Sequence, residues 1–315
     1  LHFSPSFREY AEGLASRLVA VRGVRGGTVV EVGCGDGYFL GLLARLGGCR
    51  AHGFDPAFDA GRAGVLPEGV TIHAREFGAG DAGLRARLVV CRHVLEHIWS
   101  PVAFLASLRG AMGGAGGEGA IFVEVPNGRW LVESRAVWDV IYEHCTYYTP
   151  GSLARVLEAA GFAVERVEAA YGDQFLTALA RVGSPGAGAA KGPNAGEAAA
   201  ARGFGEGHRE KVGHWTLVLA ERAARRERVA LWGAGSKGVT FLNALGSAAA
   251  GVACAVDANP RKQGCFIAGA GHEIVAPASL AAQRPAAVIV MNPLYQKEVA
   301  GALAQLGLSP EVLVA

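Results

Sequence analysis

The sequence of 315 residues predicts an α/β protein with two successive domains, each built around a doubly wound sheet. Two observations carry this prediction. In the first half of the chain, short apolar segments rich in β-branched residues alternate with segments of helical periodicity. In addition, a strand that runs into a glycine-rich turn and then a helix occurs twice, near residue 33 and near residue 233. We expect domains at 1–182 and 227–315, joined by a Gly/Ala-rich linker and a connecting helix over 183–226.

Composition restricts the class of protein. Half of the residues are apolar and 18% are charged, which indicates a folded globular chain. The net charge is +2 without a basic run, so we expect no nucleic-acid partner. No segment is long and apolar enough to span a membrane, and the first residues do not form a signal peptide. Six scattered cysteines without a CxxC pair predict neither a metal site nor a disulfide framework.

These features are typical of a reduced cytoplasmic protein. They leave the oligomeric state open between a monomer and a homodimer.

The first glycine turn organises the N-terminal domain. Residues 7–21 predict an amphipathic helix, and residues 29–32 predict a buried strand. The turn Gly33–Gly37 leads into a helix over 38–46, so backbone N–H groups at a helix N-terminus face the turn. The next strand, 51–55, ends in an acidic residue.

The remaining elements of this domain follow the same alternation, which predicts a parallel sheet with helices on both faces. Pro101 is expected to begin a helix, and Gly161 to close another that starts at Pro150. The predicted strands are 70–74, 88–91 and 120–125, followed by a closing pair at 162–169 and 174–182.

The C-terminal part repeats the theme after a linker. Residues 183–205 are rich in Gly, Ala and Pro, and 206–226 predict a polar helix. Strands are expected at 228–232, 252–257 and 286–291, with GAGSKG (233–238) at the first strand-to-helix junction.

The turn GCGDG identifies a candidate cofactor site. Its GxGxG spacing, with Glu31 inside the preceding strand, is similar to S-adenosylmethionine sites in Rossmann-like methyltransferases. Asp55 lies at the offset where an acid meets ribose hydroxyls. The alternative is a purely structural turn. The cofactor-binding residues predicted here are Glu31, Gly33, Gly35, Gly37, Asp55 and Pro56.

Two further strand ends contribute candidates at the same edge of the sheet. Glu76 and Phe77 follow the third strand, where a carboxylate and an aromatic face suit an adenine; an ordinary loop is the alternative. Arg92 and His93 follow the fourth strand, at the carboxyl edge where ligands bind in open α/β sheets. We expect both to line the cofactor or substrate cleft, and His97 to have a structural role in the turn that follows.

The segment YEHCTYYT (142–149) is the densest polar and aromatic cluster, and it follows the fifth strand. A histidine with a pKa near neutrality beside groups that orient it is what general base catalysis requires. We therefore predict His144 as catalytic, with Glu143, Tyr142 and Tyr147 beside it. The alternative is a packed loop.

The second glycine turn allows three interpretations. Asp257 stands at a plausible ribose offset from GAGSKG, which favours NAD. Gly235, Ser236 and Lys237 at a helix N-terminus would equally hold the diphosphate of a substrate. A turn that binds no ligand is the third possibility.

Together these residues resemble one family, the S-adenosylmethionine-dependent C-methyltransferases of nucleotide-linked deoxysugars. The motifs that carry the resemblance are EVGCGDGYFL, RHVLEHIWSP, EVPN, YEHCTYYT, LWGAGSKGVTFLN and VDANPRKQG. The resemblance implies a class I Rossmann-like methyltransferase domain and a smaller Rossmann-like C-terminal domain. It implies methylation of a carbon next to a keto group in natural-product (antibiotic) biosynthesis, with His144 as base, Glu143 beside it, and the C-terminal domain holding a nucleotide-sugar.

The sequence departs from this family in two respects. Family members carry an N-terminal zinc-binding domain with clustered cysteines, which we expect this chain to lack. They also have a tyrosine three residues before the base, where this chain has Ile141. O- or N-methylation of a sugar or another small natural product is therefore an alternative, and NAD-dependent oxidation through the GAGSKG domain is a third.

Overall fold

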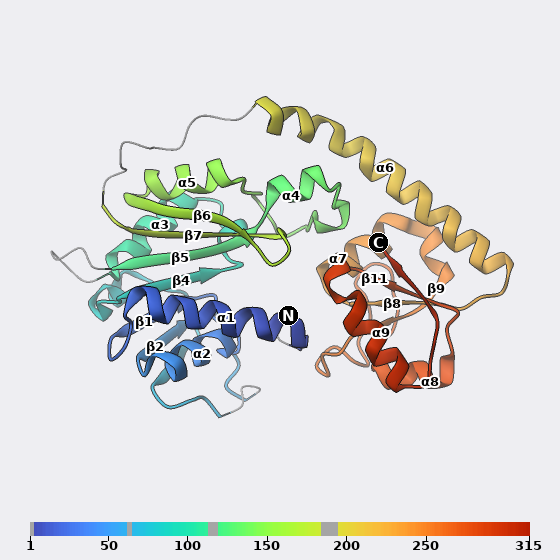
Figure 1. Cartoon of the computed structure of the whole chain (residues 1–315), viewed down its shortest axis with the longest axis horizontal. Helices are drawn as coiled ribbons and strands as arrows, with labels where there is room; N and C mark the ends of the chain where they lie inside the picture. Colours follow the sequence, from blue (N-terminus) through green and yellow to red (C-terminus); the bar gives the residue numbers. More distant parts are fainter. Residues whose placement is uncertain (1–2, 62–64, 113–118, 184–194) are drawn as a thin grey trace. The chain divides into compact units, whose positions relative to one another are not determined.

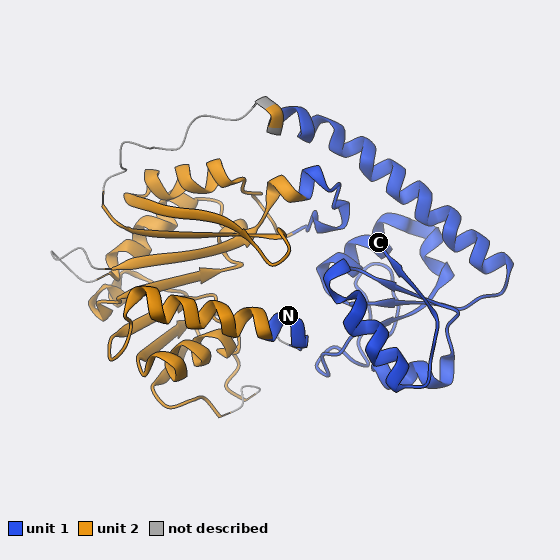
Figure 2. Ribbon diagram, in the orientation of Figure 1, with its two compact units in different colours: residues 1–8, 131–142, 198–315 blue, residues 9–130, 143–197 orange. Residues whose placement is uncertain are grey.

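The computed structural model describes residues 3–61, 65–112, 119–183 and 195–315. The chain divides into two compact units (Figure 2). The first unit in chain order comprises residues 9–130 and 143–197 and is labelled unit 2 (orange) in Figure 2. The second comprises residues 1–8, 131–142 and 198–315 and is labelled unit 1 (blue) there. Most of the predicted linker, 184–194, lies outside the described residues.

The first unit contains a mixed seven-stranded sheet in the order β3-β2-β1-β4-β5-β7-β6 (Figure 1). The first five strands are parallel, and β7 lies antiparallel between β5 and β6. This arrangement confirms the predicted parallel sheet with a closing pair. The strands are β1 (Thr28–Val32), β2 (Arg50–Phe54), β3 (Val70–His73), β4 (Leu88–Arg92), β5 (Ala120–Pro126), β6 (Phe162–Ala170) and β7 (Phe175–Val182).

The helices around this sheet begin and end where local chemistry dictates. Pro101 occupies the first turn of α3, Thr149 caps α5 by accepting from the Ser152 amide, and Gly161 follows α5 with φ +84°. The helices are α1 (Pro5–Arg22), α2 (Tyr38–Gly47), α3 (Pro101–Gly110), α4 (Gly128–Glu133) and α5 (Pro150–Ala159), with short 3-10 turns η1 (Ala79–Leu84) and η2 (Leu95–His97). A third 3-10 turn, η3 (Val137–Asp139), belongs to the other unit.

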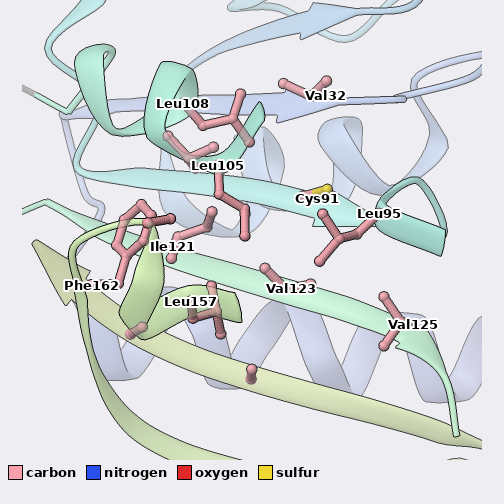
Figure 3. Packing of buried hydrophobic residues seen from close by; sticks show 14 of the residues in the cluster. Val32, Cys91, Leu95, Leu105, Leu108, Ile121, Val123, Val125, Leu157 and Phe162 are labelled. Carbon is pink, nitrogen blue, oxygen red and sulfur yellow. The ribbon is translucent and has the colours of Figure 1, made fainter. Parts of the chain in front are cut away.

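Successive strand residues point to opposite faces of the sheet, and the two faces differ in chemistry. One face is an apolar core. Figure 3 shows Leu105 and Leu108 of α3 and Leu157 of α5 packed with Ile121, Val123 and Val125 of β5. On the other face, Leu14 and Leu18 of α1 lie beside Phe122 of β5. The same face also carries two buried acidic residues, Glu31 of β1 and Glu124 of β5.

The second unit contains a five-stranded parallel sheet in the order β10-β9-β8-β11-β12. Its strands are β8 (Val229–Trp232), β9 (Val252–Val256), β10 (Ile274–Val275), β11 (Ala287–Val290) and β12 (Glu311–Val314). Its helices are α6 (Ala195–Ala224), α7 (Ser236–Leu245), α8 (Leu280–Gln283) and α9 (Gln296–Gln305), with 3-10 turns η4 (Gly246–Gly251), η5 (Pro277–Ser279) and η6 (Pro293–Tyr295). Helix α6 begins within the segment that was expected to be a linker.

Residues 131–142, which the sequence analysis assigned to the first domain, pack with the second unit. Trp138 is 2% exposed and shares a core with Trp215 and Phe241. Its ring meets that of Phe241 edge-on, at 5.0 Å between centroids. Asp139 of the segment 131–142 forms an ion pair with Lys237 of α7, at 2.7 Å. The core of the second unit therefore includes a loop that leaves the first sheet after β5.

Two further properties bear on the class of protein. None of the helices in the described part of the chain combines the length and apolar character needed to cross a membrane. All six cysteines, each within the described residues, are free.

We predict that Trp138→Ala lowers the free energy of unfolding of the second unit by about 3–5 kcal/mol, because it leaves a cavity beside Phe241. Urea unfolding followed by circular dichroism measures this change. Trp99, which is 87% exposed, is the matched control, and Trp99→Ala should shift stability by less than about 0.5 kcal/mol. Equal effects of the two substitutions would contradict the assignment of Trp138 to this core.

Candidate functional site

The site lies at the carboxyl edge of the first sheet, where β1, β2, β4 and β5 end. The turn after β1 is held in shape by its backbone: the Gly33 amide donates to Phe54 of β2 at 2.8 Å. Gly33 and Gly35 have φ of +72° and +56°, in the left-handed region that favours glycine. At Gly33 an added Cβ would lie 2.1 Å from Val94, whereas at Gly35 it would meet no protein atom within 4 Å. Gly35 therefore faces open space.

Asp55 braces this turn from the end of β2. Its Oδ2 accepts from the Gly35 amide at 2.8 Å, and its Oδ1 accepts from the Ala57 amide at 2.8 Å. Each carboxylate oxygen has a further lone pair. Asp55 therefore fixes the turn and still offers acceptors to a ligand. Pro56, which follows, is exposed.

Glu31 lies in β1 directly beneath the turn and is 2% exposed. Burial raises its pKa to about 8, although nearby Arg92 partly offsets that effect. Its Oε2 has no hydrogen-bond partner among the described residues. At neutral pH the side chain is thus largely a protonated acid with an unused polar atom.

The end of β3 contributes an aromatic wall. Phe77 is half-buried and meets Phe54 edge-on, at 5.2 Å between ring centroids. Arg75 lies over the other ring, 5.1 Å from the Phe54 centroid, and pairs with Asp81. Glu76 is exposed. Of the two predicted adenine contacts, Phe77 has the more restricted position.

Arg92 and His93 meet a buried carboxylate that sequence reasoning did not single out. Glu124 of β5 is fully buried. Its Oε1 accepts from Arg92 Nη2 at 2.7 Å and Nε at 3.0 Å, and lies 3.0 Å from His93 Nε2. Its Oε2 accepts from the Tyr10 hydroxyl of α1. Arg92 and His93 therefore belong to a buried ionic cluster, which we define as Tyr10, Arg92, His93 and Glu124.

The pKa values show that this cluster is charged. Burial opposes ionisation of Glu124, but Arg92, His93 and Tyr10 outweigh it and lower the pKa of Glu124 to about 2. Burial likewise opposes the charge on His93, but its contacts with Glu124 and Glu96 raise the pKa of His93 to about 9. At neutral pH Glu124 is an anion and His93 a cation.

The segment around His144 is clamped to the turn after β4. The amides of Cys145 and Thr146 donate to the Glu96 carbonyl at 2.8 and 3.2 Å. His97 Nδ1 lies 3.0 Å from the Glu143 carbonyl, and the Cys145 thiol donates to the His97 carbonyl at 3.4 Å. These bonds bring two segments that are far apart in the chain into one place.

These hydrogen bonds bring together three side chains that can each bind a proton or a metal ion, Glu96, His97 and His144. Glu96 is 1% exposed, and its Oε2 has no hydrogen-bond partner within the described ranges. One ligand atom each of Glu96, His97 and His144 lies within 4.8 Å of the others. The rings of His97 and His144 meet edge-on at 4.8 Å.

His144 itself is half-buried, and burial lowers its pKa, with Glu96 as the strongest opposing charge. The ring is therefore neutral at pH 7. Tyr147 lies 5.5 Å from it between ring centroids. Glu143 is exposed and supplies its carbonyl to His97, while Tyr142 is 99% exposed and belongs to the second unit. The buried carboxylate near His144 is thus Glu96.

In the second unit, GAGSKG occupies the predicted junction between β8 and α7. Gly235 precedes the first turn of α7, Ser236 is exposed, and Lys237 pairs with Asp139. Asp257 is engaged internally: its Oδ2 accepts from Lys262 at 3.0 Å and from the Ala234 amide at 3.2 Å. This pairing favours the two interpretations of the turn that need no ribose at Asp257.

Sequence reasoning missed Glu124 and Tyr10, and gave Glu96 no role. A signal for Glu124 was available. Like Glu31, it is an acidic residue inside an otherwise apolar strand, which requires a buried partner. Tyr10 carried no such signal, because its partner lies on another element.

The raised pKa of His93 predicts how stability depends on pH. Its folded pKa of about 9 lies above the unfolded value of 6.5, so its contribution is complete below pH 6.5 and is lost as pH rises through 9. We expect the free energy of unfolding, from urea titrations at pH 6, 7.5 and 9, to fall over this range.

His93→Gln is the control for that measurement. Glu31 also has a raised pKa and contributes a decline of the same sign in both proteins. The decline should therefore be shallower in His93→Gln. An identical slope in the two proteins would show that His93 is not the group responsible.

Two models of protein families match the sequence of this chain. A model described as a methyltransferase domain matches residues 6–167, and a C-methyltransferase C-terminal domain matches residues 196–308. The C-methyltransferase NovU of Streptomyces niveus is 34% identical over 151 residues, which is 46% of this chain and 35% of that protein. The chain thus spans about a third of the length of this relative.

Among solved structures, the chain is similar to the Burkholderia thailandensis 1,6-didemethyltoxoflavin-N1-methyltransferase, with 18% identity, TM-score 0.42, and coverage of 57% of this chain and 82% of that one. It is also similar to human N-acetylserotonin methyltransferase, with 18% identity, TM-score 0.43, and coverage of 56% and 55%. The methyltransferase-domain match covers more than half of the chain and, with the second match, confirms the predicted fold class, a methyltransferase domain followed by a second α/β domain. The chain belongs to the methyltransferase-domain family, and its C-terminal part matches the C-methyltransferase C-terminal domain.

Proposed function

We propose that this chain methylates a carbon next to a keto group of a small-molecule acceptor, with His144 as the general base. The observation that carries the proposal is the position of His144: a neutral, half-buried imidazole held near the buried carboxylate of Glu96. A base must be unprotonated before it takes a proton, and the lowered pKa of His144 meets that requirement. The match of the C-terminal domain to C-methyltransferases supports carbon as the acceptor atom.

The residues of the glycine turn suit the cofactor. The open space at Gly35 admits a ligand against the backbone, and Glu31 Oε2 is a buried polar atom without a partner in the described chain. Asp55 offers further acceptors to ribose hydroxyls, and Phe77 an apolar face to an adenine. When bound, S-adenosylmethionine supplies a reactive methyl group. Gly33 and Gly37 shape the turn, and we assign Arg92 and His93 to supporting it from below.

In this mechanism the chain positions groups and moves one proton. His144 takes a proton from the acceptor carbon, and the resulting carbanion, stabilised as an enolate by the neighbouring keto group, is the nucleophile. Glu96 stabilises the imidazolium that forms, because an anion nearby favours the charged ring. Positioning accounts for most of the catalysis. We assign Tyr147 to contact with the acceptor, because its ring is close to that of His144.

We also propose that the acceptor is a nucleotide-linked sugar, held in part by Gly235, Ser236 and Lys237. A helix N-terminus beside a lysine suits a diphosphate. Lys237 forms an ion pair with Asp139, so its ammonium group would contact both Asp139 and the diphosphate. The assignment of this turn to substrate is separate from the role of His144, so either proposal can fail alone.

We predict that His144→Gln lowers turnover by about 10²–10⁴-fold, because the group that takes the proton is lost. Calorimetry should show S-adenosylmethionine bound with unchanged affinity. Full turnover in this variant would contradict the role of His144 as base.

Glu96→Gln and Glu143→Gln make a matched pair, since each removes one negative charge next to a histidine of the site. We expect Glu96→Gln to lower turnover and to shift the acidic limb of its pH profile to lower pH, because Glu96 raises the pKa of His144. Glu143 is exposed, so the effect of Glu143→Gln should be much smaller. If Glu143→Gln had the larger effect, the supporting carboxylate would be the adjacent one in sequence.

The cofactor site is tested by Gly35→Ala against Gly26→Ala. Both glycines have φ in the left-handed region, +56° and +67°, and neither has a protein atom within 4 Å of an added Cβ. Each substitution should destabilise the fold by a similar amount, about 1–2 kcal/mol. Only Gly35→Ala should weaken S-adenosylmethionine binding in calorimetry. Equal affinities in the two variants would exclude close approach of the ligand to Gly35.

The reaction type is separable from the base. Product formed with a ¹³C-labelled methyl donor and a keto-sugar nucleotide distinguishes C–CH₃ from O–CH₃ or N–CH₃ by NMR. A product methylated on oxygen or nitrogen would be consistent with His144 as base, but would show that the acceptor atom is not carbon. Calorimetry with NAD tests the oxidoreductase alternative.

A further inference from the structure

We propose that Glu96, His97 and His144 form a binding site for a divalent transition metal ion of the Zn²⁺ type, and that the ion inhibits methyl transfer by occupying the lone pair of the base. The inhibitory part rests on the proposed role of His144; the metal site does not. The spacing of the cysteines predicts no metal site, but these three donors come from two different loops, the turn after β4 and the segment around His144.

The donor set is that of a transition-metal site. Two imidazoles and a carboxylate, with further positions open, are ligands that Zn²⁺, Co²⁺ and related ions accept. One ligand atom from each residue already lies within 4.8 Å of the other two. Donors bound to one ion at about 2.1 Å stand roughly 3–3.5 Å apart. A closure of up to roughly 1.5 Å is needed, and the exposed ring of His97 has room to supply much of it.

Two features prepare these donors for a metal. His97 Nδ1 faces the Glu143 carbonyl at 3.0 Å, so it carries the proton and Nε2 keeps its lone pair. Metal-binding histidines commonly have such a backbone partner, which fixes their orientation. Glu96 Oε2 is buried and has no hydrogen-bond partner among the described residues, so a cation would satisfy an atom that is otherwise unpaired.

A metal ion and the proton of the acceptor would use the same nitrogen lone pair of His144, whose ring lies 4.8 Å from that of His97 between ring centroids. A bound ion therefore competes with the acceptor's proton. No redox step is involved, and removal of the ion restores the base.

The experiment titrates the purified full chain with Zn²⁺ by calorimetry and with Co²⁺ by visible absorption. We expect one ion per chain, and an affinity reduced about 10- to 100-fold or more in His97→Asn and in Glu96→Gln. His214, an exposed histidine of α6, is the control, and His214→Asn should bind as the unaltered protein does. Circular dichroism confirms that each variant is folded. His97 is exposed, so its substitution should not disturb the core.

The same samples are then assayed for methyl transfer. Zn²⁺ should inhibit at the concentrations that fill the site, and a chelator should restore turnover. Absence of stoichiometric binding, or equal binding in His97→Asn, would overturn the metal site and leave the base role standing. Full turnover with the site filled would overturn inhibition and also contradict His144 as base, although the metal site itself would stand.

Discussion

The buried pairing of Arg92 with Glu124 is the interaction on which the rest of the site depends. Two charges out of water are costly unless they are paired and hydrogen-bonded, and here Glu124 accepts two N–H groups from one guanidinium. His93 and Tyr10 add to the same carboxylate. Because Arg92 ends β4 and Glu124 lies near the end of β5, this pairing fixes the two strand ends against each other at the point where both loops of the site begin.

The next level of organisation is made by backbone groups. The carbonyl of Glu96 accepts from two amides of the loop that contains His144, and the carbonyl of Glu143 faces the ring of His97. Side chains are therefore positioned by hydrogen bonds that depend on the path of the chain, not on residue identity. The resulting placement leaves Glu96 buried near His144 and turns Glu143 outward. A carboxylate adjacent in sequence is not the one adjacent in space.

The difference between neighbours in sequence and neighbours in space also explains which features of the structure could be predicted from the sequence. Strands with β-branched runs, the glycine turn, Pro101 at the start of α3 and Gly161 after α5 are local features, and the structure has them where expected. β10 was not predicted, because two residues are too few for periodicity to indicate a strand. β12 was not predicted either, although it is as long as β8 and β11. The Glu124 pairing and the burial of Trp138 with Phe241 depend on residues far apart in the chain, which no local pattern encodes.

A site built this way has a consequence for selectivity between protons and metals. An imidazole that lies beside a second histidine and a buried carboxylate with an unused oxygen offers its lone pair to a cation. A proton taken from the acceptor binds to a single lone pair. A metal ion needs several donor atoms that converge on it. His97 is the residue that separates these uses, since it adds a donor for a metal without being needed to accept a proton from carbon.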